Sequence, residues 1–409
     1  MKTWTGAALL IVTALSSGSL RAQTLEELKA MLDANQGFAL REAVRHGHAP
    51  AFYRGAVEDS ENRTAAAIKD LEKAIRANPR SEESFEAHLM IANMGFRGGR
   101  FHDALLEAKA AHAVKPDSED LNNALPLFEA LAESPDMQLV ERQDSHLEMR
   151  GDGGGSHGLP MTIDGKEVTY GFDSGAALSG MGVSDAKMLG LKVRHVESNL
   201  TEASGKAIPG YDIAFANDLV IAGLHLRNVP FFVLQDNGEP WVHVPVGSRG
   251  VIGLPVLLAM QTVRWQHGAW FEFGKHARAK SPAAQNLLFH GATAIVQVQV
   301  EGKALTLSLD TGAADTDLNE GFAKALPDLV KAGTKETRAI TGLGGSNEYD
   351  SVLLGPVAFD VGGKIVTLPS PHVFPTHALG KFDGNLGNDI LKQTRAVTLD
   401  FRTMKLTLE

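Results

Sequence analysis

Two stretches of the chain, 137 residues apart, repeat each other without a gap. The first, IDGKEVTYGFDSGA, ends at Ala176, and the second, VEGKALTLSLDTGA, ends at Ala313. In each stretch a Gly-Lys turn joins two runs of strand-like residues, and the second run ends in Asp-Ser/Thr-Gly-Ala. The repeat restricts the fold to one in which two similar β units occur in a single chain.

A second pair of similar stretches follows the first pair in the same order. GVIGLPVLLAMQTVRW contains Gly253, which lies 80 residues after Asp173, and GNLGNDILKQTRAVTLDF contains Gly387, which lies 77 residues after Asp310. A lone Asp-Ser/Thr-Gly triplet is also typical of an ordinary Asx-turn that closes a hairpin. Two triplets with the same flanking motifs in the same order indicate an internal duplication.

Together these motifs resemble those of the retropepsin-like aspartic proteases, over residues from about 147 to 409. In that family each lobe supplies one aspartate on a wide turn, and the apolar-apolar-Gly motif braces the turn from behind. The resemblance implies a catalytic pair formed by Asp173 and Asp310. It also implies supporting residues in the turns and in the braces, namely Ser174, Gly175, Thr311 and Gly312, and Val251, Ile252, Gly253, Leu386 and Gly387.

Two positions depart from the family pattern. Asn385 stands where an apolar residue is expected, and Pro255 stands at the place held by Asn388 or Asp389 in the second copy. We expect these departures to weaken the braces and to leave the acids untouched. Because both lobes occur in one chain, the resemblance implies that the site forms within a monomer.

Paired carboxyl groups suit the hydrolysis of peptide bonds. Two carboxyl groups within hydrogen-bonding distance cannot both ionise cheaply, so they share one proton and titrate as a coupled pair. The ionised group would activate a water and the protonated group would donate to the peptide carbonyl, with no cofactor and no metal. The resemblance implies that the hydroxyls of Ser174 and Thr311 lock the turns together. A second hypothesis stays open, in which the scaffold binds extended peptides without useful turnover.

The resemblance also implies β-hairpin flaps over the substrate. By their position between the motifs, TEASGKAIPGYDIAF (201–215) and RAITGLGGSNEYDS (338–351) are the flap candidates, and their glycines suit tight turns. Tyr211 and Tyr349 in these segments either contact substrate or pack on neighbouring strands.

Residues 23–140 have a helical composition rich in Ala, Leu, Glu and Lys, with apolar residues at three- and four-residue spacing. The segment repeats with a period of 37 residues, close to the period of about 34 in tetratricopeptide (TPR) repeats, which it resembles. The matching positions are Ala67, Leu71, Ala74 and Pro79 in one copy and Ala104, Ala108, Ala111 and Pro116 in the other. Such a domain would either recruit a protein partner or pack as helical hairpins on the next domain.

The N-terminus has the pattern of a secretory signal. Lys2 precedes an apolar run from Gly6 to Leu15, and small residues continue to Ala22. The run is too short to span a bilayer, so we expect a signal peptide at 1–22, a periplasmic or secreted protein, and no membrane span in the mature chain. The absence of cysteine excludes disulfides and thiol catalysis. A net charge of −10 with no basic stretch argues against a nucleic-acid partner.

We therefore predict a multidomain chain of α plus all-β class. A TPR-like α-helical repeat domain at 23–140 precedes a bilobal, mainly β aspartic-protease pseudo-dimer of the retropepsin/pepsin-like kind. Lobe one occupies 147–274, and a polar linker at 275–289 leads to lobe two at 290–409. The expected ligand is a peptide or protein substrate, with a protein partner on the helical repeats as a further expectation.

Overall fold

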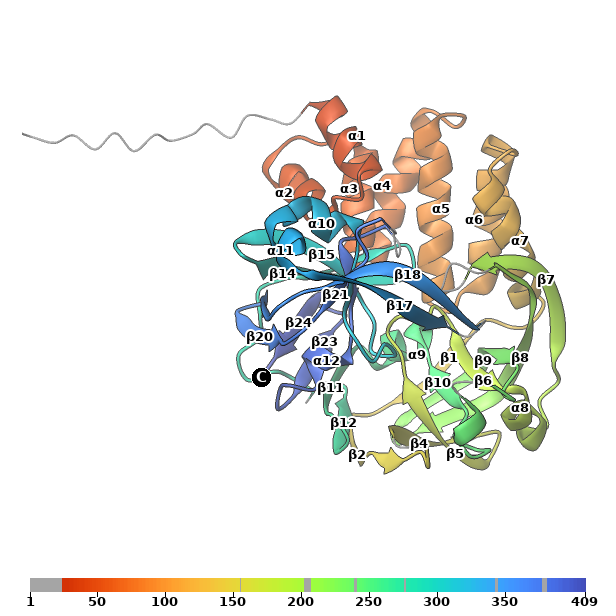
Figure 1. Ribbon diagram of the computed structural model, residues 1–409. Coiled ribbons are helices and arrows are strands. Elements are labelled where there is room, and N and C mark those ends of the chain that lie inside the picture. Colours follow the sequence, from red (N-terminus) through yellow and green to blue (C-terminus); the bar gives the residue numbers. More distant parts are fainter. Residues whose placement is uncertain are drawn as a thin grey trace, which may run out of the picture.

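The computed structural model describes residues 24–154, 156–201, 207–238, 241–275, 277–342, 345–376 and 381–409. The predicted signal peptide lies outside these ranges. Figure 1 shows a layer of helices above two β regions, of which lobe one is yellow to green and lobe two is teal to blue. Within the ranges described, no helix has the length and apolar character needed to cross a membrane.

The helical layer contains antiparallel helices that pack against their neighbours in the chain. Its first helix begins with a capping box, in which the Thr24 side chain accepts from the backbone N–H of Glu27 and the Glu27 side chain accepts from the N–H of Thr24. Ser81 caps the fifth helix in the same position. The helices are α1 (Leu25–Asp33), α2 (Gly37–His46), α3 (Ala51–Ser60), α4 (Thr64–Ala77), α5 (Glu82–Arg97), α6 (Phe101–Val114) and α7 (Glu119–Ala132).

The repeated small residues of the sequence lie on α4 and α6. Ala67 and Leu71 on α4, and Ala104 and Ala108 on α6, are completely buried. The alanines are small enough to let adjacent helices approach closely, as α5 approaches α6, and Leu71 meets α3 at Gly55. The tetratricopeptide resemblance itself stays a prediction.

Lobe one is a twisted sheet with short helices at its ends. In strand order it runs β1-β9-β6-β10-β5-β4-β8-β7, with β3 paired to β4. Its elements are β1 (Gln138–Arg142), β3 (Arg150–Gly151), β4 (His157–Ile163), β5 (Lys166–Phe172), β6 (Ser179–Gly182), α8 (Val183–Leu189), β7 (Arg194–Thr201), β8 (Ala207–Ile221), β9 (Leu224–Leu234), η1 (Trp241–His243), β10 (Gly250–Ile252) and α9 (Leu254–Met260).

Lobe two is a second sheet of the same kind. Its strand order is β17-β18-β21-β16-β22-β15-β14-β19-β20, with β13 paired to β14. Its elements are β13 (Leu287–His290), β14 (Thr293–Val300), β15 (Lys303–Leu309), β16 (Asp317–Leu318), α10 (Glu320–Ala325), α11 (Pro327–Ala332), β17 (Thr334–Gly342), β18 (Gly345–Leu353), β19 (Val357–Val361), β20 (Lys364–Leu368), β21 (His372–Val373), β22 (Gly384–Leu386) and α12 (Asn388–Leu391).

The two lobes repeat one set of strand pairings around the acidic motifs. The hairpin β4–β5 corresponds to β14–β15, and the strand that ends before each aspartate pairs in parallel with β10 in lobe one and with β22 in lobe two. Each of these partners also pairs antiparallel with the short strand after the aspartate, β6 or β16. Both hairpins turn through two residues of positive φ, Asp164-Gly165 and Glu301-Gly302, as a two-residue β-turn of this hand requires.

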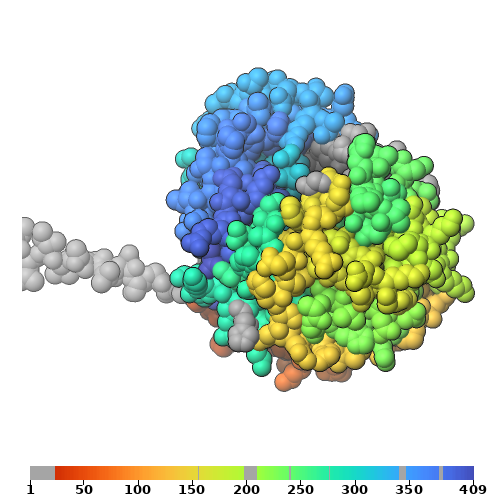
Figure 2. Space-filling view, turned by 90° about the horizontal axis from the view of Figure 1, so that it is seen from below, coloured from red at the N-terminus to blue at the C-terminus, as the bar shows by residue number. Residues whose placement is uncertain are grey.

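A third sheet joins the lobes. Its order is β2-β12-β11-β23-β24, so strands that follow the last motif of each lobe pair with each other through β11 and β23. The strands are β2 (Ser145–Glu148), β11 (Thr262–Gln266), β12 (Trp270–Phe273), β23 (Val397–Asp400) and β24 (Lys405–Leu408). The buried apolar residues of both lobes form one continuous cluster. Figure 2 shows the two lobes side by side on one face, with the helical layer largely behind them.

The end of the predicted linker is a strand. β13 begins at Leu287, inside the segment 275–289, and pairs with β14. Its residues Leu287, Leu288 and Phe289 are buried, because one side of the strand faces lobe two and the helical layer covers it at α2 and α3.

The helical layer packs on both lobes. Buried residues of α5, α6 and α7 form one apolar cluster with Val196, Tyr211 and Ile213 of lobe one, while Phe38 of α2 packs on Leu288 and Ile295 of lobe two. The layer and the lobes therefore share cores and do not meet only through a flexible linker.

Arg97 on α5 is buried and makes a polar contact between the layer and lobe two. Its side chain bonds the Asp59 carboxylate at 2.6 Å and donates to the Gly291 carbonyl at 2.9 Å. The guanidinium carbon lies 4.7 Å from the ring centroid of Phe289. A single cation thus connects α5, α3 and the turn after β13.

We expect Arg97→Ala to lower the free energy of unfolding by about 3–5 kcal/mol, because Asp59 would stay buried without its partner. Urea denaturation measures the change. Arg76→Ala is the matched control, because Arg76 forms an exposed i,i+4 pair with Glu72 worth about 0.5 kcal/mol or less. Equal losses in the two variants would contradict the role given to Arg97.

Candidate active site

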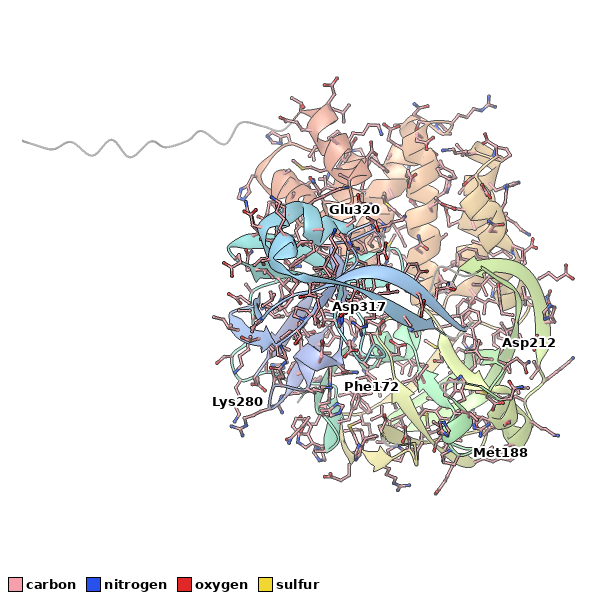
Figure 3. All side chains as sticks on the ribbon, in the orientation of Figure 1. Phe172, Met188, Asp212, Lys280, Asp317 and Glu320 are labelled. Carbon is pink, nitrogen blue, oxygen red and sulfur yellow. The ribbon has the colours of Figure 1, made fainter. Side chains whose placement is uncertain are left out.

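Strand ends position the two predicted acids. β5 ends at Phe172, which lies between the lobes near the middle of the view in Figure 3, and Asp173 follows it. In lobe two β15 ends at Leu309, and Asp310 follows. The backbone N–H of Asp173 donates to the Ile252 carbonyl at 2.9 Å, and that of Asp310 donates to the Leu386 carbonyl at 3.0 Å. The second motif of each lobe therefore holds its turn in the way predicted for the braces.

Reciprocal hydrogen bonds of two hydroxyl groups lock the turns to each other. The backbone N–H of Ser174 donates to Thr311 Oγ1 at 2.9 Å, and the N–H of Thr311 donates to Ser174 Oγ at 3.2 Å. Each hydroxyl in turn donates across the interface, Ser174 to the Leu309 carbonyl and Thr311 to the Phe172 carbonyl. Both side chains are buried. Four bonds thus fix the position of one aspartate relative to the other.

The glycine of each turn makes room for the acid of the other lobe. A Cβ atom on Gly175 would lie 2.8 Å from the carboxyl carbon of Asp310, and one on Gly312 would lie 2.6 Å from that of Asp173. Contacts this short are not tolerated, so a side chain at either position would push the carboxyl groups apart. The structure therefore brings together all six residues predicted for the site: Asp173, Ser174, Gly175, Asp310, Thr311 and Gly312.

The environment of Asp173 favours its protonated form. Burial, and then the negative charge of Asp310, raise the pKa of Asp173 to about 7, against the opposing hydrogen bond from the Gly175 N–H. Two carboxyl groups in contact behave as one unit that holds a single proton near neutral pH. The pair can therefore supply an acid and a base at the same time.

The expectation that the two departures leave the acids untouched is wrong for Asn385. Its side-chain N–H group donates to Asp310 Oδ2 at 3.2 Å, and its Oδ1 accepts from the Ser308 hydroxyl at 2.7 Å. Reading lobe two against lobe one could have revealed this pair, because Gly171 and Val251 stand at the corresponding positions. Pro255 lies in the first turn of α9, where a missing N–H costs nothing.

Both flap candidates lie within long antiparallel hairpins, β7–β8 and β17–β18. Residues 202–206 and 343–344 at their turns lie outside the described residues. Tyr211 is buried, with its ring 5.1 Å from that of Phe232, and Tyr349 lies with its ring 6.4 Å from that of Phe374. Of the two alternatives for these tyrosines, packing on neighbouring strands describes the contacts observed.

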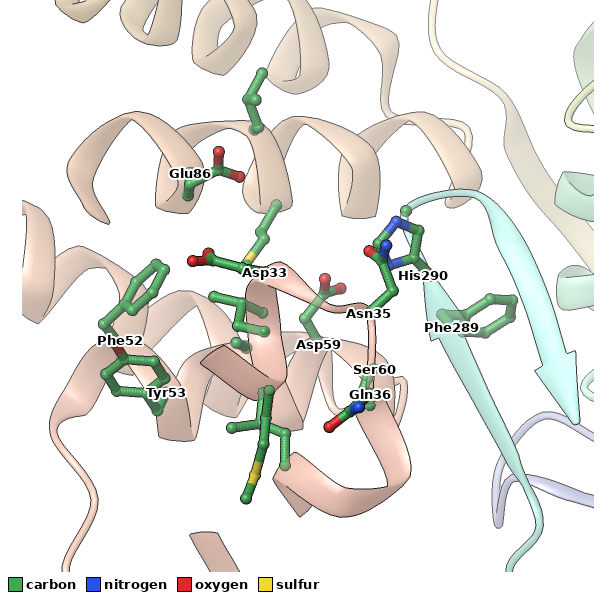
Figure 4. A pocket seen from close by; sticks show the side chains of 18 of the residues that line it. Asp33, Asn35, Gln36, Phe52, Tyr53, Asp59, Ser60, Glu86, Phe289 and His290 are labelled. Atoms are coloured by element: carbon green, nitrogen blue, oxygen red, sulfur yellow. The ribbon is translucent and has the colours of Figure 1, made fainter. Parts of the chain in front are cut away.

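A cavity of about 440 Å³ lies away from the acids, between the helical layer and lobe two. Figure 4 shows Asp33, Asp59 and Glu86 approaching it from the helices and His290 from β13. Burial raises the pKa of Glu86, and burial together with Lys381 lowers the pKa of His290 to about 4. Among the side chains described, no three His, Asp or Glu residues are grouped to hold a metal ion, here or elsewhere.

One part of the chain matches a known protein family. Residues 159–256, most of lobe one, match the family described as aspartyl protease. Among solved structures, the EIAV protease in complex with an inhibitor is 26% identical over 24% of this chain and 85% of that chain, with a TM-score of 0.19. A TM-score this low carries no argument about the fold, which rests on the strand pairings above. No curated protein matches the chain. The family match supports an aspartic protease of the kind that the paired acids suggest.

The pKa of Asp173 makes a prediction about stability. Because its folded value of about 7 lies above its unfolded value of about 3.9, the native protein binds the extra proton, and stability should fall as pH rises from about 4 to about 7. Asp173→Asn removes this loss. We expect the free energy of unfolding of the variant to exceed that of wild type by about 2–4 kcal/mol at pH 8. Below pH 4, where Asp173 is protonated in both states, ionisation should contribute no difference.

Urea denaturation across this pH range measures the difference. Asp328→Asn, at a side chain that is 94% exposed, is the control and should track wild type. A constant offset of Asp173→Asn at every pH would show that the acid does not titrate as described.

Proposed function

We propose that the chain is an aspartic endopeptidase, which hydrolyses peptide bonds with a water activated between Asp173 and Asp310. One observation carries the proposal: the two carboxyl groups are in hydrogen-bond contact beside the reciprocal Ser174 and Thr311 hydrogen bonds, where burial and the charge of Asp310 raise the pKa of Asp173. An ordinary hairpin turn needs neither the partner acid nor the lock.

The proposed reaction balances within the pair. The ionised carboxylate takes a proton from water as the water oxygen bonds to the peptide carbon, and the protonated carboxyl gives its proton to the carbonyl oxygen. The result is a tetrahedral diol. The carboxyl group that took the proton from water then gives it to the peptide nitrogen, and the C–N bond breaks. A hydroxyl of the diol returns a proton to the other carboxylate. Carboxylic acid and amine leave, and the pair again holds one proton.

The hairpins β7–β8 and β17–β18 would cover an extended substrate, a monomer would suffice because both acids lie in one chain, and the protein would act in the periplasm or outside the cell. We further propose that the helical layer recruits a protein substrate or partner. Leu106 on α6, a large apolar side chain that is 68% exposed, is the position at which this part of the proposal is tested.

Asp173→Asn and Asp310→Asn should each reduce cleavage of a peptide library by roughly 10²–10⁴-fold or more, because either acid alone lacks its partner. The measurement is the rate of product formation with purified protein, with circular dichroism to show that both variants fold. Asp328→Asn is the matched surface control. A wild-type chain that binds peptides without cleaving them would favour the second hypothesis, a binding scaffold, and activity retained in either acid variant would refute the dyad.

The recruiting role is tested at Leu106. We expect Leu106→Glu to lower kcat/KM on an unfolded protein several-fold and to leave a short peptide unaffected, because the contact would lie far from the scissile bond. Lys109→Glu, which changes charge on the same helix without removing an apolar contact, is the comparison. An equal effect on both substrates, or none on either, would contradict recruitment through this face.

A further inference from the structure

The hydrogen bonds that reach the two acids are not symmetric. Asp173 accepts from the backbone N–H groups of Gly175 and Ala176, and Asp310 accepts in the same way from Gly312 and Ala313. Asp310 receives one bond more, from the side-chain amide of Asn385 to Oδ2 at 3.2 Å. The backbone N–H groups of the two turns donate to the acids in the same way, so within the described residues the two acids differ only in the bond from a side chain.

The additional donor belongs to a pair of residues that occurs in lobe two and is replaced in lobe one. Ser308 on β15 is directly opposite Asn385 on β22, and the corresponding opposed residues in lobe one are Gly171 and Val251. Neither Gly171 nor Val251 has a side-chain donor. The two lobes therefore share the fold of the site, but lobe two has polar side chains beside its acid where lobe one has none at these two positions.

Ser308 fixes which end of the amide faces the acid. Its hydroxyl has two acceptors in reach, Asn385 Oδ1 at 2.7 Å and the Gly384 carbonyl at 3.3 Å, and donation to the nearer one leaves the Nδ2 group directed at Asp310. An N–H donor stabilises a carboxylate much more than a carboxylic acid, which has less negative charge on its oxygens. The pair of residues thus distinguishes two states of the dyad that would otherwise be close in energy.

We propose that Asn385, oriented by Ser308, keeps the negative charge on Asp310 and the shared proton on Asp173. The catalytic part of this inference rests on the proposed endopeptidase function. Asp310 then takes the proton from water, and Asp173 protonates the carbonyl oxygen. Asn385 acts through Asp310, so it is a positioning residue for the reaction.

In the part of the chain that the structure describes, the side-chain amide of Asn385 is the group that β22 directs at Asp310. β22, which packs beside the acid, consists of Gly384, Asn385 and Leu386, none of which is charged. Across the lobe interface the titratable group that faces Asp310 is Asp173, and Asp310 is the charge that acts on Asp173. A shift in the location of the proton therefore reports on Asn385.

The first experiment locates the proton without any need for turnover. Carbon-13 NMR of the aspartate carboxyl groups at about pH 6, with signals assigned through Asp173→Asn and Asp310→Asn, should show a carboxylate at Asp310 and a carboxylic acid at Asp173. In Asn385→Val the two signals should move toward a common average. Equal signals in wild type, or a carboxylate at Asp173, would overturn the proposal even if the chain is an active protease.

The second experiment uses the pH profile of kcat/KM. Asn385 stabilises the pair once Asp310 has ionised, so Asn385→Val should move the acidic limb to higher pH by about one unit. The alkaline limb should stay in place, because Asp310 is ionised on both sides of it. Ser308→Ala should move the acidic limb in the same direction by less, and it serves if Asn385→Val fails to fold.

A transplant provides the matched control. An added Cβ at Gly171 meets Val251 at 3.4 Å, an ordinary contact, so Gly171→Ser with Val251→Asn can copy the pair into lobe one. In the Asn385→Val background this should transfer the carboxylate signal to Asp173. Loss of rate without any shift of the limbs or signals would assign Asn385 a structural role only. Absence of proteolysis with the expected NMR signals would refute the proposed function and leave the proton assignment standing.

Discussion

The reciprocal hydrogen bonds between Ser174 and Thr311 are the contact on which the rest of the site depends. Each turn uses the other lobe's hydroxyl to satisfy its buried backbone N–H, so neither turn is complete alone. This contact holds the two carboxyl groups together in a buried site, where burial and then the negative charge of Asp310 raise the pKa of Asp173. The sheet that joins β11 to β23 holds the lobes close enough for the lock to form.

Duplication explains why the site is nearly symmetric, and Asn385 is a position at which the two lobes differ. Two identical lobes would give two acids with no basis for choosing which holds the proton. A single chain can differ at corresponding positions, and here it does so beside one acid, where Ser308 and Asn385 replace Gly171 and Val251. The change is chemically sensible because hydrolysis requires one acid and one base rather than two equal groups.

Much of the fold and of the candidate site could be predicted from the sequence, because the duplicated motifs contain both the residues that shape the backbone and the acids. The hairpins, the acids, the hydroxyl lock and the close approach at Gly175 and Gly312 all follow from residues in short, contiguous motifs. The contact between Asn385 and Asp310 was missed since a family pattern marks Asn385 only as a departure. The burial of Arg97 depends on packing between segments about 200 residues apart, which local periodicity does not encode. The strand at Leu287 pairs with the neighbouring strand β14, and the prediction missed it because the linker was extended to residue 289.

The helical layer makes the two hairpins unequal. Val196, Tyr211 and Ile213 of β7–β8 are buried in one apolar cluster with α5, α6 and α7, so displacing that hairpin would expose apolar surface. β17–β18 is joined to the rest of lobe two by the pairing of β18 with β21, by the buried Val352, and by Arg338, which forms ion pairs with Asp315 and Asp317. Local opening is easiest where few apolar contacts are lost. For the proposed protease, movement that admits a substrate should therefore fall mainly on β17–β18, which belongs to the lobe whose acid Asn385 contacts.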